Sequence, residues 1–300
     1  MQLRARQFTV IDAEPPPPGL LGRHAQSRGY LLYSARYANI YTVRHLLQLV
    51  REAFGAPPKA NPVWRRGAAF FDAFRPSVEP EGLRSVDEVI AHRVKHLAAV
   101  KAVVETLDVL VFTFGLTEAW IETASGTVFP VAPGVLAGAF DQDVYNFKNF
   151  THAEILADFC ALRDEIRAVN PRARFILTVS PVPLAATASG QHVLSATTYS
   201  KAILRAVAGE LETTFEDVDY FPSYELIASP LARAAYYDES LRNVTPEGVA
   251  VAMRAFFDCH DPSGSAREAQ DESIEAQEAL AECDDEVVCE DAILDAFAPR

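Results

Sequence analysis

The sequence contains little cysteine, with four residues among 300: Cys160, Cys259, Cys283 and Cys289. They form no C-x-x-C pair and none of the cysteine and histidine spacings typical of zinc ligands. The sequence therefore predicts neither a disulfide framework nor a structural zinc site. Low cysteine usage of this kind favours a reducing compartment, and we predict a cytoplasmic location.

Long apolar runs are also missing. No stretch approaches the length of a membrane span, and the first ten residues, MQLRARQFTV, lack the apolar core of a signal peptide. We therefore expect neither membrane insertion nor secretion. The chain also lacks a phosphate-binding glycine loop and a cluster of metal ligands, so we predict no cofactor and no metal.

Basic residues are too few to balance the acidic ones, and the net charge is −14. Residues 261–300 carry thirteen Asp or Glu against Arg267 and Arg300, so this segment accounts for −11 and leaves about −3 for residues 1–260. A nearly neutral body without a basic stripe argues against nucleic acid and anionic membranes as partners. We assign residues 1–260 to one α/β domain and residues 261–300 to an acidic, flexible tail in which 287–297 could form one short helix.

The sequence is organised around residues 109–120, VLVFTFGLTEAW. The run from Val109 to Phe114 is β-branched and aromatic, the pattern of a parallel strand covered on both faces. It ends at Gly115, after which Thr117 and Glu118 offer a hydroxyl and a carboxylate. Open α/β sheets place their ligand sites at the carboxyl ends of strands, so this stretch indicates a site. The alternative is a turn followed by a helix start, since Thr and Glu also suit a helix N-terminus.

Other elements follow from periodicity and capping residues. The first six residues have the pattern of a last helical turn. Amphipathic patterns predict five longer helices, at 42–55, 85–107, 151–169, 195–212 and 245–259, and Ser85 and Thr151 each open an S/T-x-x-E capping box. Three further strands are expected, at 7–12, 174–180 and 217–221.

Three histidines and one long loop carry weaker signals. His45 is predicted as a surface or packing residue of its helix. His92 and His96 share a helix face, but no third ligand accompanies them, so a solvated face is predicted rather than a metal site. Residues 57–80, which include Asp72 and Arg75, are expected to be irregular, and a functional loop and a structural flap are equal alternatives.

Several blocks, in consistent order over about residues 5–260, resemble the GSCFA-domain proteins. They are SARYANIYT, FDAFRPSV, FTFGLTEAW, TVSPVPLAAT, YSKAILRA, YFPSYE and NVTPEGVAVAM. That family is similar to the SGNH hydrolases, so the resemblance implies a flavodoxin-like, three-layer α/β fold with a mostly parallel sheet. It also implies acyl-ester hydrolysis or transfer, plausibly on carbohydrate, by a serine, a histidine and an aspartate with oxyanion donors.

The match to the SGNH pattern is partial. The Gly-Ser-Cys-Phe-Ala block that would hold the serine is absent, and we expect that it and the first strand would precede Met1. The resemblance places Ala38, Asn39 and Gly115 among the oxyanion or substrate-binding residues. Thr117, followed by Glu118, stands where SGNH enzymes have asparagine.

The Asp-x-x-His pair aligns with Ser240-Leu241-Arg242-Asn243. Asparagine cannot serve as a base near neutral pH. The resemblance therefore places Thr117, Glu118 and Asn243 at catalytic positions. We nevertheless expect the chain to be inactive. We also expect Thr117, Glu118, Asn39 and Asn243 to line one cleft.

Two other hypotheses about the function of the chain remain open. The chain could instead be a glycan- or protein-binding module in which the cleft recognises a glycan and residues 262–300 recognise a partner protein. Alternatively, Ser34, Ser180 or Ser223 could act as an unusual nucleophile, although strand-end serines are usually turn hydroxyls. For the sheet, we expect four strands, with 7–12 paired directly to 109–114, or else a detached N-terminus.

Overall fold

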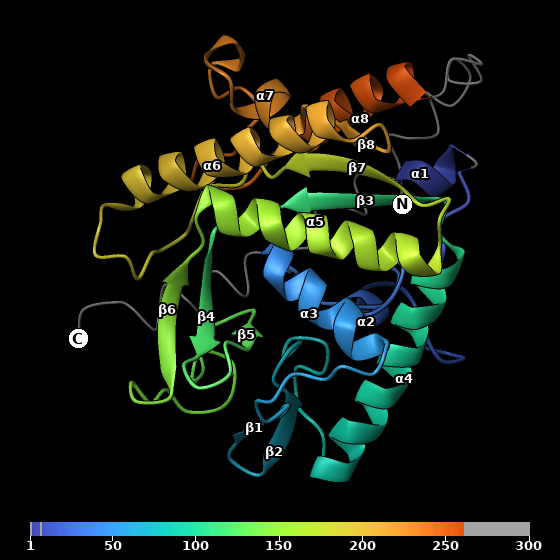
Figure 1. Cartoon of the computed structure of the whole chain (residues 1–300), viewed down its shortest axis with the longest axis vertical. Helices are drawn as coiled ribbons and strands as arrows, with labels where there is room; N and C mark the ends of the chain where they lie inside the picture. The colour runs from blue at the N-terminus through green and yellow to red at the C-terminus, as the bar shows by residue number, and fades with distance from the viewer. Residues whose placement is uncertain (1, 7, 261–300) are drawn as a thin grey trace.

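The computed structural model describes residues 2–6 and 8–260 (Figure 1). The acidic segment 261–300, with its predicted short helix and interaction role, lies outside the described residues. Within them the chain is a mixed α/β protein built around a small parallel sheet, as the sequence predicted in outline. None of the described helices combines the length and the apolar character needed to cross a membrane.

The parallel sheet has three strands in the order β3-β7-β8, with β7 in the centre. Their bounds are Val109–Phe114 for β3, Arg174–Val179 for β7 and Val218–Tyr220 for β8. Five of the six residues of β7 are buried, as expected for an apolar strand covered on both faces. Figure 1 shows β3 and β7 side by side, with the long helix α5 (His152–Val169) running along β3, just below it in this view.

Long helices cover both faces of β7. Alternate residues of β7, such as Phe175 and Leu177, pack into the main core with helices α3 to α6, whereas Ile176 packs with Phe256 and Phe257 of α8 on the opposite face. The helices are α3 (Val43–Ala53), α4 (Val86–Thr106), α5 (His152–Val169), α6 (Val193–Thr214), α7 (Ser223–Ala228) and α8 (Pro246–His260).

Helix starts follow the predicted capping chemistry. The side chains of Thr42, Ser85 and Thr151 each accept a hydrogen bond from the backbone N–H three residues on. At Thr151 the capping box is complete, because the Glu154 carboxylate also accepts the Thr151 backbone N–H. At Ser85 the returning bond reaches the Arg84 N–H instead, so that box is only half formed.

The predicted N-terminal strand is wrong. Residues 8–12 form no strand, and the four-stranded sheet expected from their pairing with 109–114 does not form. The N-terminus is not detached, however, because Phe8 packs in the α8 cluster and Ile11 packs on the main core. A short helical turn, α1 (Gln2–Ala5), precedes them, in line with the helical pattern of the first six residues.

As a result β3 is an edge strand with one bare face. Val109 and Val111 are 45% and 47% exposed, whereas Phe112 and Phe114 are buried. The expectation that both faces of this strand are covered is therefore not met among the described residues, since the side chains of Val109 and Val111 remain nearly half exposed.

Two β structures were not anticipated. After Thr117 the chain continues as a strand, not as a helix start, and forms an antiparallel sheet in the order β5-β4-β6. Its strands are β4 (Glu118–Glu122), β5 (Val128–Phe129) and β6 (Tyr145–Asn149). The excursion 57–80 contains a hairpin, β1 (Val63–Arg66) and β2 (Ala69–Asp72), so it is not wholly irregular. The remaining elements are α2 (Gly22–Gln26) and the 3-10 turn η1 (Pro230–Ala232).

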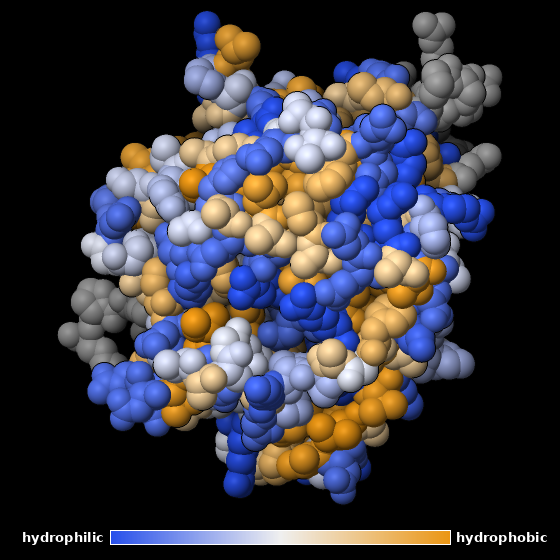
Figure 2. Space-filling model, in the orientation of Figure 1, coloured by the Kyte–Doolittle hydropathy of each residue, from blue (hydrophilic) through white to orange (hydrophobic). Residues whose placement is uncertain are grey.

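Apolar surface also occurs on α4. Val86, Ile90 and Val94 are spaced four residues apart and are 40–62% exposed. Figure 2 shows apolar surface at the bottom of the molecule, in the region of α4 and the β1–β2 hairpin.

Candidate functional site

The carboxyl end of β3 meets the segment before α3. The backbone N–H of Leu116 donates a hydrogen bond to the Tyr41 carbonyl at 2.9 Å. A Cβ atom at Gly115 would lie 3.1 Å from that same oxygen, so glycine allows the close approach of the two backbones. Two of the blocks that the sequence analysis associated with the site are therefore in direct contact.

Helix α6 fixes the same strand end from the other side. The Lys201 ammonium donates to the Gly115 carbonyl at 2.9 Å, and the Thr117 backbone N–H donates to the Ser200 hydroxyl at 3.1 Å. Both α6 side chains are buried, and a buried lysine has to be held by such polar partners. Both residues lie in the YSKAILRA block, for which no role in the site was predicted from the sequence.

The Thr117 side chain is fully buried, and its hydroxyl has no hydrogen-bond partner among the described residues. An unpaired buried hydroxyl costs about 1–3 kcal/mol. Glu118, the first residue of β4, is half-buried and accepts a hydrogen bond from the Thr187 hydroxyl at 2.7 Å. Burial raises the pKa of Glu118, and the bond from Thr187 only partly offsets this. The strand end thus offers an unpaired hydroxyl and a carboxyl that protonates more readily than usual.

Ala38 and Asn39 lie just before the Tyr41 contact. Ala38 adopts φ = 57°, in the left-handed region where a Cβ atom is unfavourable. The Asn39 amide donates to the Tyr41 hydroxyl at 2.9 Å and its oxygen accepts from the Tyr33 hydroxyl at 3.4 Å. Alanine at this position therefore carries a conformational cost that glycine would not.

Asn243 lies in the loop before α8. Its side-chain amide donates to the Asp238 carboxylate at 2.9 Å, and its backbone carbonyl accepts the Asp238 N–H at 3.0 Å. Hydrogen bonds from Ser240 and Asn243 lower the pKa of Asp238 to about 2. No hydrogen bond between described residues joins Asn243 to Thr117, Glu118 or Asn39, so a cleft shared by these four residues remains a prediction.

The three serines considered as unusual nucleophiles make turn and strand-end contacts. The Ser223 hydroxyl donates to the Val179 carbonyl at 3.1 Å, and the Ser180 hydroxyl accepts the Val182 N–H at 3.2 Å. Ser34 accepts the Ala13 N–H through its backbone carbonyl. No imidazole bonds to any of these hydroxyls within residues 2–6 and 8–260, which leaves them without a proton acceptor of the triad type.

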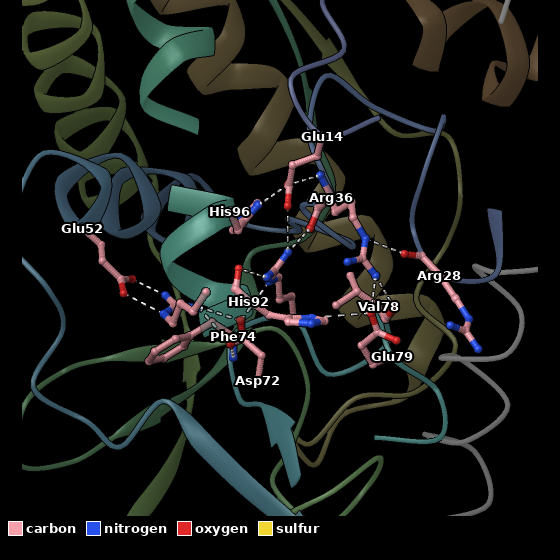
Figure 3. A network of polar contacts seen from close by, with 12 residues as sticks. Glu14, Arg28, Arg36, Glu52, Asp72, Phe74, Val78, Glu79, His92 and His96 are labelled. Carbon is pink, nitrogen blue, oxygen red and sulfur yellow. Dashed lines mark hydrogen bonds and ion pairs between the residues drawn. The ribbon is translucent and has the colours of Figure 1, made fainter. Parts of the chain in front are cut away.

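A second polar centre, which the sequence analysis did not predict, lies between α3, α4 and the loop after β2 (Figure 3). Asp72 accepts hydrogen bonds from Arg75 at 2.8 Å and from Arg93 at 2.9 and 3.0 Å. Arg93 also binds the Glu52 carboxylate through two nitrogens. Burial raises the pKa of Asp72, but the charges of Arg93 and Arg75 outweigh it and hold that pKa below its ordinary value. The carboxylate is therefore ionised and paired within the protein.

The same centre corrects the interpretation of the α4 histidines. His96 is 1% exposed, so it does not lie on a solvated face, whereas His92 is partly exposed. The Glu14 carboxylate lies 2.6 Å from His96 Nδ1 and also accepts the Arg36 N–H at 2.7 Å. His45 is buried as well, which confirms the packing alternative for that residue.

No group of three or more His, Cys, Asp or Glu within residues 2–6 and 8–260 could hold a metal ion. The family model described as the GSCFA family matches residues 2–256. Comparison with curated proteins and with solved structures gives no match.

Proposed function

The chain belongs to the GSCFA family, and from that premise we propose that it binds an acylated carbohydrate or another small ester at the carboxyl end of β3 without hydrolysing it by a serine mechanism. If the SGNH hydrolases are relatives of this family, this is an acyl-ester site that has kept its ligand-binding groups and lost its catalytic ones. The parallel sheet supports this placement, because ligands of open α/β sheets bind beyond the carboxyl ends of the strands.

The observation that most supports a site without serine-type hydrolysis is the hydrogen bonding of Asn243, which stands at the expected position of the base. A serine mechanism needs a group that takes the serine proton and returns it to the leaving group, and a carboxamide has no such titration near neutral pH. The Asn243 amide instead acts as a hydrogen-bond donor to Asp238. Its contacts support a role in loop structure rather than in proton transfer.

Thr117 supplies the binding group in this proposal. Its hydroxyl has no hydrogen-bond partner in the described part of the chain, so an ester carbonyl that accepted its hydrogen bond would recover a cost of about 1–3 kcal/mol. Lys201 and Ser200 hold the backbone at Gly115 and at Thr117 itself and would keep the donor in place. Glu118 would contribute a polar group at the start of β4.

The first test is turnover. We expect the purified 300-residue chain to show no hydrolysis of short-chain aryl esters, and Asn243→His alone to restore none, because one triad residue contributes little without its partners. Clear turnover by the unmodified chain that is abolished by Ser34→Ala, Ser180→Ala or Ser223→Ala would contradict the proposal and support an unusual nucleophile.

The second test measures binding of an O-acetylated oligosaccharide by ligand-observed NMR. Thr117→Val removes the hydroxyl with little change of shape and should weaken binding by about two- to tenfold, the equivalent of one neutral hydrogen bond. Thr113→Val, an exposed residue of the preceding strand β3, is the matched control. Equal binding by both variants would remove Thr117 from the site.

A further inference from the structure

A small pocket opens beside the second polar centre, away from the strand end. It is bounded by α3, α4, the loop after β2 and the segment before Ala38. Its lining includes Tyr37, His45, Leu49, Phe74, Arg93 and His96. The space inside the pocket is about that of one water molecule, so it suits a single hydroxyl or a similarly small group.

The charged groups of this wall are already paired with one another. Arg93 is held by Asp72 and Glu52. Arg75 donates to Asp72 and to the carbonyls of Arg36 and His92. Burying a further ion here would need a partner charge, and these guanidinium and carboxylate groups have theirs. The pocket is therefore poorly suited to an anion or a cation.

The neutral side chains that line the pocket, unlike the charged ones, retain atoms that can still form hydrogen bonds. His45 Nδ1 is buried and has no partner among the described residues. An ionised Glu14 can only accept, so His96 Nδ1 carries the proton of that bond, and His96 Nε2 is then an acceptor. No described residue forms a hydrogen bond with His96 Nε2 or with the Tyr37 hydroxyl. The rings of His96 and Tyr37 pack edge to face, with 5.7 Å between their centroids.

These rings are uncharged at neutral pH. Burial lowers the pKa of His45 to about 4, and burial together with the charge of Arg75 lowers the pKa of His96 to about 4. Burial and the charge of Glu14 raise the pKa of Tyr37. A hydroxyl group matches such a wall, because it can donate to His96 and accept from Tyr37 at the same time.

We propose that this pocket binds a neutral, hydroxyl-bearing small molecule, with its hydroxyl on His96 Nε2 and its carbon skeleton against Leu49 and Phe74. The Glu14 carboxylate is a positioning group that fixes the ring and its tautomer. This site is separate from the ester site at the β3 end and stands whether or not that proposal holds, since its residues differ.

The test uses the full chain with 15N-labelled histidine, glycerol as the probe, and two-bond 1H–15N spectra at neutral pH. Without glycerol, His96 should show the neutral tautomer with Nδ1 protonated. Glycerol should move the His96 Nε2 signal along a saturable curve, while the exposed His24 and His192 should not respond. Sodium acetate, a charged probe of similar size, should give no saturable change.

Two variants keep the proposal falsifiable. Tyr37→Phe retains the ring and removes the hydroxyl, so glycerol should bind about two- to tenfold more weakly, whereas Tyr199→Phe on the surface of α6 should not change the curve. His45 also lines the pocket, so its signal reports on glycerol when His96 is replaced. His96→Gln should leave His45 without a glycerol-dependent shift, whereas His92→Gln, one turn earlier on α4, should preserve that shift. Near-UV circular dichroism checks that each variant is folded.

Three outcomes would overturn the proposal. They are no saturable change with glycerol, a curve that neither Tyr37→Phe nor His96→Gln alters, and a curve produced by acetate but not by glycerol. The first outcome would mean that the pocket holds only water.

Discussion

Replacing Asp72 by asparagine tests the central ion pair of the buried network. The side chains of Asp72 and of its partners Arg75 and Arg93 are each at most 5% exposed. Asparagine preserves the shape and one acceptor oxygen, but it removes the negative charge between two guanidinium groups. Because the pKa of Asp72 lies below its ordinary value, the native state contains the ionised form near neutral pH.

The size of the effect follows from what the two arginines retain. Breaking a buried ion pair by removing one partner costs about 3–5 kcal/mol. Arg93 keeps its two bonds to Glu52, whereas Arg75 is left with Glu14 at 3.8 Å and two backbone carbonyls. We therefore expect Asp72→Asn to reduce the free energy of unfolding by about 3 kcal/mol, at the lower end of that range.

Urea unfolding of the full chain at pH 7 measures this loss, with tryptophan fluorescence and far-UV circular dichroism as two probes of one transition. The matched control is Asp219→Asn, whose ion pair with Arg174 spans 3.4 Å between side chains that are more than half exposed. That variant should stay within about 1 kcal/mol of the parent. If the loss for Asp72→Asn is no larger than for Asp219→Asn, the network is solvated and the reasoning fails.

Two further predictions concern stability. The pKa of His45 is about 4 in the folded chain and about 6.5 when unfolded, so its contribution is present above pH 6.5 and is lost as the pH falls towards 4. His45→Gln should flatten the fall in urea midpoint between pH 7 and 4.5, to which this residue contributes on the order of 3 kcal/mol at most. Asn170, a buried residue, donates to the carbonyls of Val104 and Leu107 at the end of α4. Asn170→Ala should lower the free energy of unfolding in urea by about 2–3 kcal/mol. The control Asn146→Ala, at an exposed position of β6, should lower it by less than about 1 kcal/mol. Equal losses would contradict the role of Asn170 at the end of α4.

The elements that the sequence predicted correctly are those with local signals. Thr151 with Glu154 identifies the start of α5 from four consecutive residues, and the apolar run of β7 needs no partner to be recognised. The antiparallel sheet carries no such signal. Strand β4 pairs with β6 about 25 residues away, and both are only partly buried, so the pattern around Glu118 was equally compatible with a helix start.

Residues of the second polar centre were missed for a related reason. His92 and His96 occupy one helix face, and nothing within α4 indicates which of them is covered. The cover comes from distant segments that bring Glu14 and Tyr37 against His96. By contrast, the strand end at Gly115 was recognisable, because a buried strand followed by glycine and polar residues has a local pattern.

The segment from Arg36 to Tyr41 links the two polar centres. At one end the Arg36 N–H binds Glu14 and Tyr37 meets His96, and at the other the Tyr41 carbonyl binds the Leu116 N–H. Between them Ala38 adopts a left-handed conformation that costs an L-residue about 1 kcal/mol or more. Such a conformation persists only where the surrounding structure determines it from both sides. Ala38 is therefore held by its neighbours' contacts, and the position of Tyr41 at the carboxyl end of β3 depends on the carboxylate and imidazole that position Arg36 and Tyr37.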